Sequence, residues 1–293
     1  MSETEPKATG VEIVAGLYVN EPAGNDPPRL HQSLAHILVS RSPLHAWYKA
    51  FAEVPEEYTD ATDRGQLAHA LLLGGGEIVV VQANDWRTNA AKAERDAARA
   101  NGKTPVLAHK LEEASIMTEK VLSQLQKRGI ELTGESEATV IWQSPYGAWC
   151  QGRLDHFLFK SGTIWDFKFV QNASKKTCEA SFINYGYDIQ HAAYVEAIET
   201  IFPELAGRVK MLFLFIEVDP PHALRIMPVG GTMRTSGQWR WARACEEWKQ
   251  YLNFYGKETP WPAYLDDGEA AECPPWALNA QIAEETIREG SNE

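Results

Sequence analysis

The sequence lacks the cysteine spacing that marks a small metal-binding module. Its four cysteines are widely separated and form no Cys-x-x-Cys pair; they are Cys150, Cys178, Cys245 and Cys273. A zinc ribbon or a local iron–sulfur site is therefore not supported. We expect buried, reduced thiols instead, as in proteins of a reducing compartment.

The sequence also lacks a long apolar run and an excess of basic charge. No segment reaches the roughly 20 apolar residues of a membrane-spanning helix, and the polar N-terminus has no secretory pattern. We therefore predict a cytoplasmic protein without membrane association. Lysine and arginine number 28 against 40 aspartate and glutamate, which gives a net charge of −12. Such a chain has no general polyanion-binding surface, so any contact with nucleic acid must come from local basic clusters or metal ions.

Apolar periodicity predicts both helices and strands along the 293 residues. Helices are predicted at 31–51, interrupted near Pro43, and at 61–73, 90–100, 107–128, 187–201 and 233–255; strands are predicted at 77–82, 138–142, 148–159, 163–170, 209–218 and 223–228. This order predicts an α/β class, with a mixed central β-sheet flanked by helices and a helical N-terminal elaboration.

The same pattern predicts one folded domain between two irregular ends. A flexible or strand-like lead-in at 1–30 is rich in proline, glycine and asparagine, and an aperiodic acidic tail is expected at 266–293. The domain at 31–265 divides into a helical part at 31–130, a core at 131–230 and a C-terminal helix at 232–255.

Two neighbouring predicted strands carry the most informative residues. The first contains Gly-Arg-Leu-Asp155 and the second contains Asp166-Phe-Lys168. Because residues i and i+2 of a strand share a face, Asp166 and Lys168 point together while Phe167 turns into a core. Two carboxylates are hard oxygen ligands suited to Mg²⁺ or Mn²⁺. A lysine beside them can orient or deprotonate a water for attack on a phosphodiester.

An Asp-x-Lys triplet alone is more often a solvated strand face with an exposed ion pair. Here the neighbours are bulky and apolar, because Trp165, Phe167 and Phe169 surround the pair. Charges in such a setting need partners or a metal ion. The sequence therefore favours a site over a solvated face.

Other polar residues are candidates for the same site. His69 lies on an apolar helix, where it is either a packed core histidine or a metal ligand. Glu137 opens the strand before Asp155 and could supply a third acid, with Glu135 as its rival. Gln190 and Tyr194 are four residues apart and share a helical face, which either aims at the site or belongs to an ordinary amphipathic helix.

Local basic groups could grip phosphates despite the acidic net charge. The candidates are Arg87, Lys92 and Arg95, and the pair Lys175 and Lys176. Ordinary solvated helix faces explain them equally well.

Taken in order, these motifs resemble the PD-(D/E)XK nuclease superfamily. More narrowly, they are similar to RecE-type (exodeoxyribonuclease VIII-like) phage-associated exonucleases, with lambda-type exonuclease a more distant relative. The segments Arg64-Gly-x-x-x-His69 and Trp261-Pro-x-Tyr264 extend the resemblance, which runs from about residue 34 to 276. One departure is Leu154, which stands where the family usually has proline before the first aspartate.

The resemblance implies a restriction-endonuclease-like core and a role for each motif residue. Metal ligands would be Asp155, Asp166 and the Phe167 carbonyl, with His69 and Glu137 completing or flanking the shell around Mg²⁺ or Mn²⁺. Lys168 would position the attacking water. Gln190 and Tyr194 would buttress the site or touch the phosphate.

The resemblance also implies an activity. It is that of a metal-dependent exonuclease that degrades double-stranded DNA ends 5′→3′ and leaves 3′ single strands for recombination. A ring-like homo-oligomer and a single-strand annealing partner would accompany it. The alternatives are a structure-specific or restriction-like endonuclease of the same fold, and a non-catalytic DNA-binding protein that retains the fold.

Overall fold

A computed structural model describes residues 15–18, 27–52, 60–74, 76–264, 268 and 270–290. Its strands are β1 (Gly16–Tyr18), β2 (Ile78–Val81), β3 (Thr104–Leu107), β4 (Glu135–Gln143), β5 (Trp149–Leu158), β6 (Thr163–Val170), β7 (Lys210–Glu217) and β8 (Leu224–Pro228). Its helices are α1 (Gln32–Ser40), α2 (Pro43–Phe51), α3 (Asp60–Leu73), α4 (Asn89–Ala100), α5 (Ala108–Gln126), α6 (Lys175–Asn184), α7 (Tyr187–Ile201), α8 (Gly231–Tyr255) and α9 (Pro275–Gly290).

A six-stranded sheet forms the centre of the molecule, with the order β1-β4-β5-β6-β7-β8. Neighbouring strands are antiparallel, except that β6 and β7 are parallel. A parallel pair requires a long crossover, and α6 and α7 provide it. The predicted α/β class with a mixed central sheet and flanking helices is therefore confirmed.

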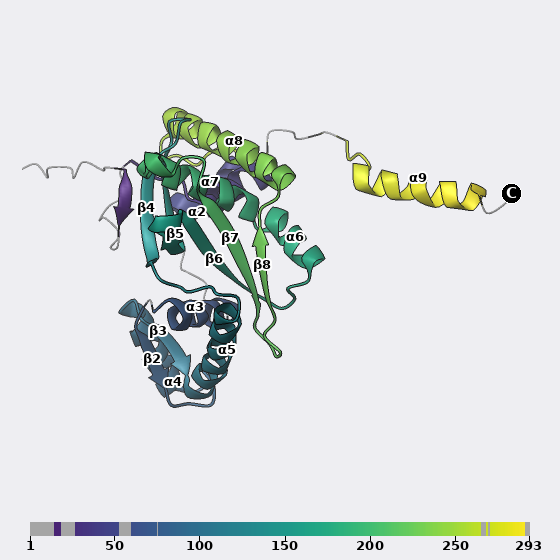
Figure 1. Cartoon of the computed structure of the whole chain (residues 1–293). Coiled ribbons are helices and arrows are strands. Elements are labelled where there is room, and N and C mark those ends of the chain that lie inside the picture. The colour runs from purple at the N-terminus through teal and green to yellow at the C-terminus, as the bar shows by residue number, and fades with distance from the viewer. Residues whose placement is uncertain are drawn as a thin grey trace, which may run out of the picture.

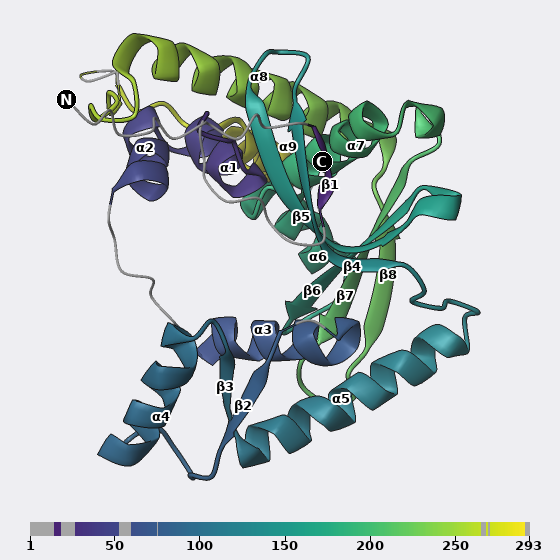
Figure 2. The same ribbon diagram turned by 90° about the vertical axis from the view of Figure 1, so that its left-hand side faces the viewer.

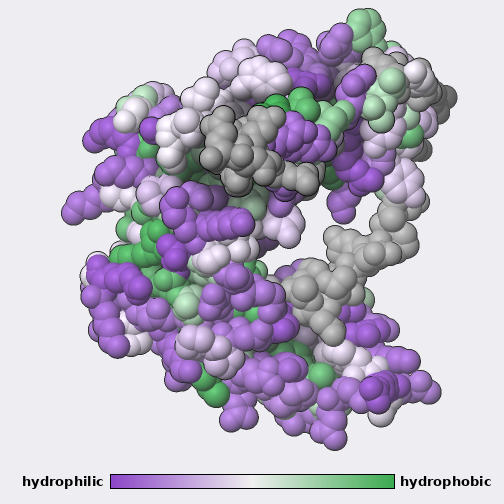
Figure 3. Space-filling view, turned by 90° about the vertical axis from the view of Figure 1, so that its right-hand side faces the viewer, coloured by the Kyte–Doolittle hydropathy of each residue, from purple (hydrophilic) through white to green (hydrophobic). Residues whose placement is uncertain are grey.

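Each face of the sheet is covered by a different set of helices (Figure 1). The larger, first core cluster joins the sheet to α1, α7 and α8. The second core cluster lies on the other face, where α3 and α5 pack against β6 and β7. In Figure 2, α3 lies against one end of β6, while β2, β3 and α4 lie farther from the sheet. The surface is hollowed between this α3–α5 part and the helices of the first cluster (Figure 3).

Local sequence explains where several elements begin and how they bury. Pro43 takes the first position of α2, because its missing N–H would have no partner there. The break near Pro43 predicted from the sequence is therefore confirmed. Trp241 and Trp248 are seven residues apart on α8, so they share a face and both are buried in the first core cluster.

Some expectations need correction, and others fall outside the described residues. The short strand β3 and the polar helix α6 were missing from the predicted pattern, because neither shows a clear apolar period. The aperiodic tail contains α9, which extends away from the body (Figure 1). Cys273 is exposed, whereas the other three cysteines are buried, and all four are free. Most of the lead-in, at 1–14 and 19–26, and the last residues, at 291–293, lie outside the described residues.

Two further features follow from the described residues. Gly16–Tyr18 of the lead-in pairs with β4 and so belongs to the sheet. No helix in the described parts of the chain is both long and apolar enough to cross a bilayer.

Candidate active site

The acidic residues of β5 and β6 lie where the ladder between these strands ends. The last pair is His156 with Trp165, so Asp155 and Asp166 come next on their strands. The Asp155 Oδ2 atom accepts the backbone N–H of Phe167 at 2.7 Å. The Asp155 carboxylate thus accepts the hydrogen bond that a backbone carbonyl of the neighbouring strand would accept in a regular ladder. The two acids are left beside the gap in the ladder.

The alternation of β5 is interrupted at the same place. Leu154 and Phe157 are three residues apart, yet both lie in the first core cluster. Residues on one face of a regular strand are an even number of positions apart, so the strand changes face between these two. Asp155 lies at this change, which lets its carboxylate meet groups from both sides of the sheet.

On β6, Asp166 and Lys168 form a buried ion pair. The Lys168 Nζ atom lies 2.7 Å from Asp166 Oδ1, and the two side chains are 17% and 1% exposed. The Gln190 side-chain amide of α7 donates to the other Asp166 oxygen. Phe167 points to the opposite face, into the second core cluster. The alternation expected for Asp166-Phe-Lys168 is therefore present.

Aromatic rings complete the surroundings of Lys168. Its Nζ atom lies 4.5 Å from the centroid of the Tyr187 ring and 5.8 Å from that of Phe213. Burial acts to lower the pKa of Lys168, but the carboxylates of Asp166 and Asp155 outweigh it and hold this pKa above its ordinary value. Lys168 is therefore an ammonium group, which donates hydrogen bonds and does not accept a proton.

A second cluster of ligand-type groups lies on the other side of Asp155. His69 Nδ1 is 3.7 Å from Glu137 Oε1 and 3.8 Å from Asp155 Oδ2. One ligand atom from each of these three residues lies within 4.8 Å of the others. His69 is carried by α3, and its ring meets Phe167 and Phe169 edge-on. The packing of α3 on the sheet therefore brings the histidine to the acids.

Glu137 reaches this cluster through an unusual backbone conformation. Its φ is +56°, a left-handed value that is rare for a residue other than glycine and costs on the order of 1–3 kcal/mol. Its flanking residues keep the register with β5, so the distortion is local. The rival Glu135 is exposed and lies near His156. The structure thus brings Glu137, and not Glu135, to the other candidates.

Burial shapes the charge of this cluster. Desolvation, followed by the nearby Asp166 carboxylate, raises the pKa of Asp155 well above its ordinary value. Desolvation likewise raises the pKa of Glu137, although Arg153 opposes the shift. Burial lowers the pKa of His69, so its imidazole is neutral at pH 7 and able to ligate a metal. The raised pKa values indicate that nearby cations do not fully offset the negative charge of these crowded carboxylates. A bound divalent ion would offset it.

Tyr194 supports the strand that carries Asp155. Its hydroxyl donates to the Arg153 carbonyl at 3.0 Å and accepts the Arg153 N–H at 3.4 Å. Its ring lies so close to Gly152 that a Cβ there would be 2.4 Å from a ring carbon. Tyr194 is buried. Its position is that of a buttress beneath β5.

The basic candidates lie on or beside helices other than the two, α3 and α7, that carry His69 and Gln190. Arg87, Lys92 and Arg95 lie on α4 or just before it, and Figures 1 and 2 place this helix away from the sheet. Arg87 and Arg95 are within ion-pair distance of Asp85 and Asp96, respectively. On α6, Lys175 pairs with Glu179 at 2.7 Å, and Lys176 is exposed.

Two residues of the site were missed from the sequence. Tyr187 lies three residues before Gln190, one helical turn away, so its helical spacing could have identified it. Arg153 lies within the Gly-Arg-Leu-Asp155 motif and binds Glu137 Oε2 through Nε at 2.7 Å. Its position two residues before Asp155 on a predicted strand could have identified it as a site residue.

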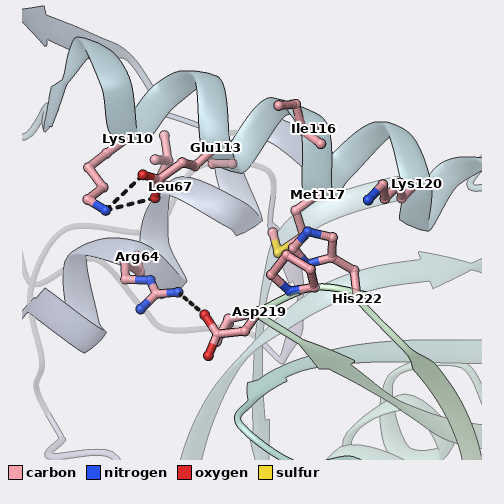
Figure 4. Close-up of a pocket in the computed structure, with 12 residues that line it drawn as sticks. Arg64, Leu67, Lys110, Glu113, Ile116, Met117, Lys120, Asp219 and His222 are labelled. Carbon is pink, nitrogen blue, oxygen red and sulfur yellow. Dashed lines mark hydrogen bonds and ion pairs between the residues drawn. The ribbon is translucent and has the colours of Figure 1, made fainter.

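A separate pocket of about 310 Å³ lies between α3, α5 and the β7–β8 connection (Figure 4). Its walls include an ion pair between Arg64 and Asp219, at 3.4 Å, and one between Lys110 and Glu113, at 2.7 Å. The paired charges largely offset one another. None of the residues around Asp155 and Asp166 lines this pocket.

Comparison with known proteins identifies a matching family and a solved structure with a similar fold. Residues 37–269 match the family described as "PDDEXK-like domain of unknown function (DUF3799)". A candidate exonuclease from Eubacterium rectale has a similar crystal structure, with a TM-score of 0.54 and 12% identity over 86% of this chain and 92% of that chain. A phage-related exonuclease from Haemophilus somnus 129PT aligns with a TM-score of 0.34 and 11% identity over 77% of this chain and 95% of that chain. No curated protein matches.

Proposed function

The chain belongs to the PDDEXK-like domain family, and on that premise we propose that it is a divalent-metal-dependent deoxyribonuclease that digests linear duplex DNA from its ends. Membership confirms the PD-(D/E)XK superfamily predicted from the motifs. The observation that carries the proposal is the meeting of Asp155, Glu137 and His69 with the Asp166–Lys168 pair at the open end of the β5–β6 ladder.

The donor set fits a hard divalent cation. Asp155, Glu137 and His69 would hold it, with Asp166 and the Phe167 carbonyl as further ligands. The raised pKa values of Asp155 and Glu137 support this assignment, because the buried acids lack a matching positive charge. Mg²⁺ or Mn²⁺ bound there would activate water and offset the negative charge of the reacting phosphate.

The remaining residues would place the reacting groups. Lys168, kept protonated by its neighbours, would donate hydrogen bonds to the attacking water or to a phosphate oxygen. Gln190 would fix the Asp166 carboxylate through its amide. Tyr194 would hold the backbone of β5 in place beneath Asp155. Such preorganisation contributes to catalysis because these groups need not reorient during the reaction.

Digestion from ends, rather than internal cleavage, is supported by two likenesses. The motif order resembles the RecE-type exonucleases, and the E. rectale fold neighbour carries the word exonuclease in its title. We extend the proposal to 5′→3′ digestion that leaves 3′ single strands for recombination. A ring-like homo-oligomer and a single-strand annealing protein as partner belong to the same proposal.

Digestion of end-labelled DNA tests this function. With Mg²⁺, linear duplex should be shortened from its 5′ ends, whereas EDTA should prevent digestion and closed circular duplex should stay intact. Nicking of the circle would instead identify an endonuclease of the same fold. Binding without digestion of either substrate would identify a non-catalytic DNA-binding protein.

The aromatic contact with Lys168 gives a graded prediction. A desolvated cation–π contact is worth about 2 kcal/mol, so Tyr187→Leu should lower kcat by roughly thirtyfold. Tyr187→Phe keeps the ring face and should retain most of the wild-type kcat. Steady-state digestion of linear duplex by the two variants checks this. Equal losses in both would show that the hydroxyl, and not the ring, matters.

A further inference from the structure

We propose that Arg153 binds a phosphate of the DNA strand beside the metal site, so that it is the substrate-binding cation of this centre. The inference rests on the proposed function and adds a residue that contacts the substrate. It follows from how the positive charges of the centre are distributed.

The two cations nearest the acids are placed very differently. The Lys168 side chain is 17% exposed and lies against Asp166 and two aromatic rings. The Arg153 side chain is 64% exposed, although its partner Glu137 is only 22% exposed. A strand arriving from solvent therefore meets the Arg153 guanidinium before it meets the Lys168 ammonium.

The guanidinium has donors to spare. It carries five N–H groups, and a single carboxylate engages at most two of them in a bidentate pair. Glu137 is bound through the Nε atom of Arg153. Because the planar fork matches a phosphate as well as a carboxylate, the same side chain can bind Glu137 and a phosphate oxygen together.

The backbone of Arg153 is held in place. Tyr194 bonds to both its carbonyl and its N–H, and the strand pairs it with Thr139 of β4. Arg153 directly precedes Leu154, which points into the first core cluster, so Arg153 lies on the face away from that core, and Asp155 follows where the strand changes face. The backbone of Arg153 is thus fixed two residues from Asp155, the proposed metal ligand. This position puts the long cationic side chain of Arg153 within reach of the reacting phosphate.

The chain offers a closely matched control. On α8, Arg243 also binds a glutamate through Nε at 2.7 Å, and the side chains of Arg243 and Glu247 are 47% and 24% exposed. This pair repeats the Arg153–Glu137 arrangement on a helix without the acidic cluster. A structural ion pair alone would make the two arginines equivalent in DNA binding.

Equilibrium binding of a short, fluorescent, blunt-ended duplex tests the inference, with Ca²⁺ replacing Mg²⁺ and KCl varied. Arg153→Gln should raise Kd about tenfold, because it removes a hydrogen bond between charged groups. The slope of log K against log salt should also become shallower by about 0.9, the value for one phosphate contact. Arg153→Lys should keep the slope but weaken binding, since it retains the charge without the fork. Arg243→Gln should change neither quantity.

The outcomes separate the inference from the function on which it rests. If wild-type protein digests DNA and Arg153→Gln keeps the wild-type Kd and slope, the inference is wrong and the function stands. If wild-type protein neither binds nor digests duplex, the proposed function fails and the inference with it. Should Arg153→Gln fail to fold, Arg153→Lys decides, and wild-type affinity in that variant would refute the contact.

Discussion

Replacing Asp155 by asparagine is expected to reduce Mg²⁺-dependent digestion of linear duplex by on the order of a thousandfold. Metal stabilisation of the transition state is worth several kcal/mol, and each 1.36 kcal/mol corresponds to about a tenfold change in rate. The fold should survive, because the asparagine oxygen can still accept the Phe167 backbone N–H that Asp155 binds at 2.7 Å. Single-turnover digestion of end-labelled duplex measures the loss.

The matched control is Asp219→Asn, which removes another aspartate from an exposed ion pair with Arg64. That change should leave the rate within about twofold of wild type, since exposed pairs contribute little. Wild-type digestion by Asp155→Asn would remove this residue from the proposed metal site.

The Asp155→Asn substitution should also raise the stability of the metal-free protein. Burial raises the folded-state pKa of Asp155, so its ionised form is less favourable in the folded chain than in the unfolded chain. Wild-type protein therefore loses stability from this group as the pH rises through that pKa, and asparagine does not titrate. The Tm advantage of Asp155→Asn should be larger at pH 8 than at pH 4.5.

Added Mg²⁺ should reverse this order of stability. A ligand that binds only the folded state stabilises it by mass action, so Mg²⁺ should raise the Tm of wild-type protein more than that of Asp155→Asn. Thermal unfolding with Mg²⁺ and with EDTA gives both quantities. An equal rise in the two proteins would mean that the ion binds elsewhere.

The largest loss of stability is expected from Arg240→Met. Arg240 Nη1 donates to both carboxylate oxygens of Asp188 at 2.8 Å, and Asp188 is fully buried. Removing one partner of a buried ion pair leaves an uncompensated charge and typically costs about 3–5 kcal/mol. This pair ties α8 to the first turn of α7, the helix that carries Gln190 and Tyr194. Urea unfolding measures the loss, and DNA digestion should fall with it.

Two further variants show whether the pairing itself matters. Arg243→Met removes an exposed i,i+4 pair on the same helix and should cost only about 0.5 kcal/mol. Asp188→Asn combined with Arg240→Met should recover part of the lost stability, because no buried charge is left without a partner. Equal costs for Arg240→Met and Arg243→Met would contradict the importance of burial.

Strand periodicity was sufficient to predict part of the site. The Asp166-Phe-Lys168 alternation follows from a two-residue repeat, and the structure separates Phe167 from its neighbours accordingly. The four-residue spacing of Gln190 and Tyr194 placed both on one face of α7, as helical geometry requires. These features depend on local backbone geometry, which a short stretch of sequence specifies.

The roles within that pattern depended on contacts between distant segments. Gln190 donates a hydrogen bond to Asp166, whereas Tyr194 donates one to the backbone carbonyl of Arg153. Two residues on one helical face therefore have different partners and different roles. Glu137, and not Glu135, reaches the site through a left-handed φ that could not be predicted from the sequence. Such a strained conformation persists only because the contacts of the surrounding sheet and of α3 hold it in place.

The sequence by itself determined the α/β class, the superfamily and the face on which each motif residue of β6 lies, because periodicity is a local property of the chain and the order of the motifs can be read directly along it. Only the tertiary structure decided that His69 joins Glu137 and Asp155, that Lys168 is enclosed by Tyr187 and Phe213, and that Arg153 stays open to solvent. Those outcomes depend on how α3 and α7 pack against opposite faces of one sheet, and long-range packing of this kind leaves no periodic trace in the residues that it brings together.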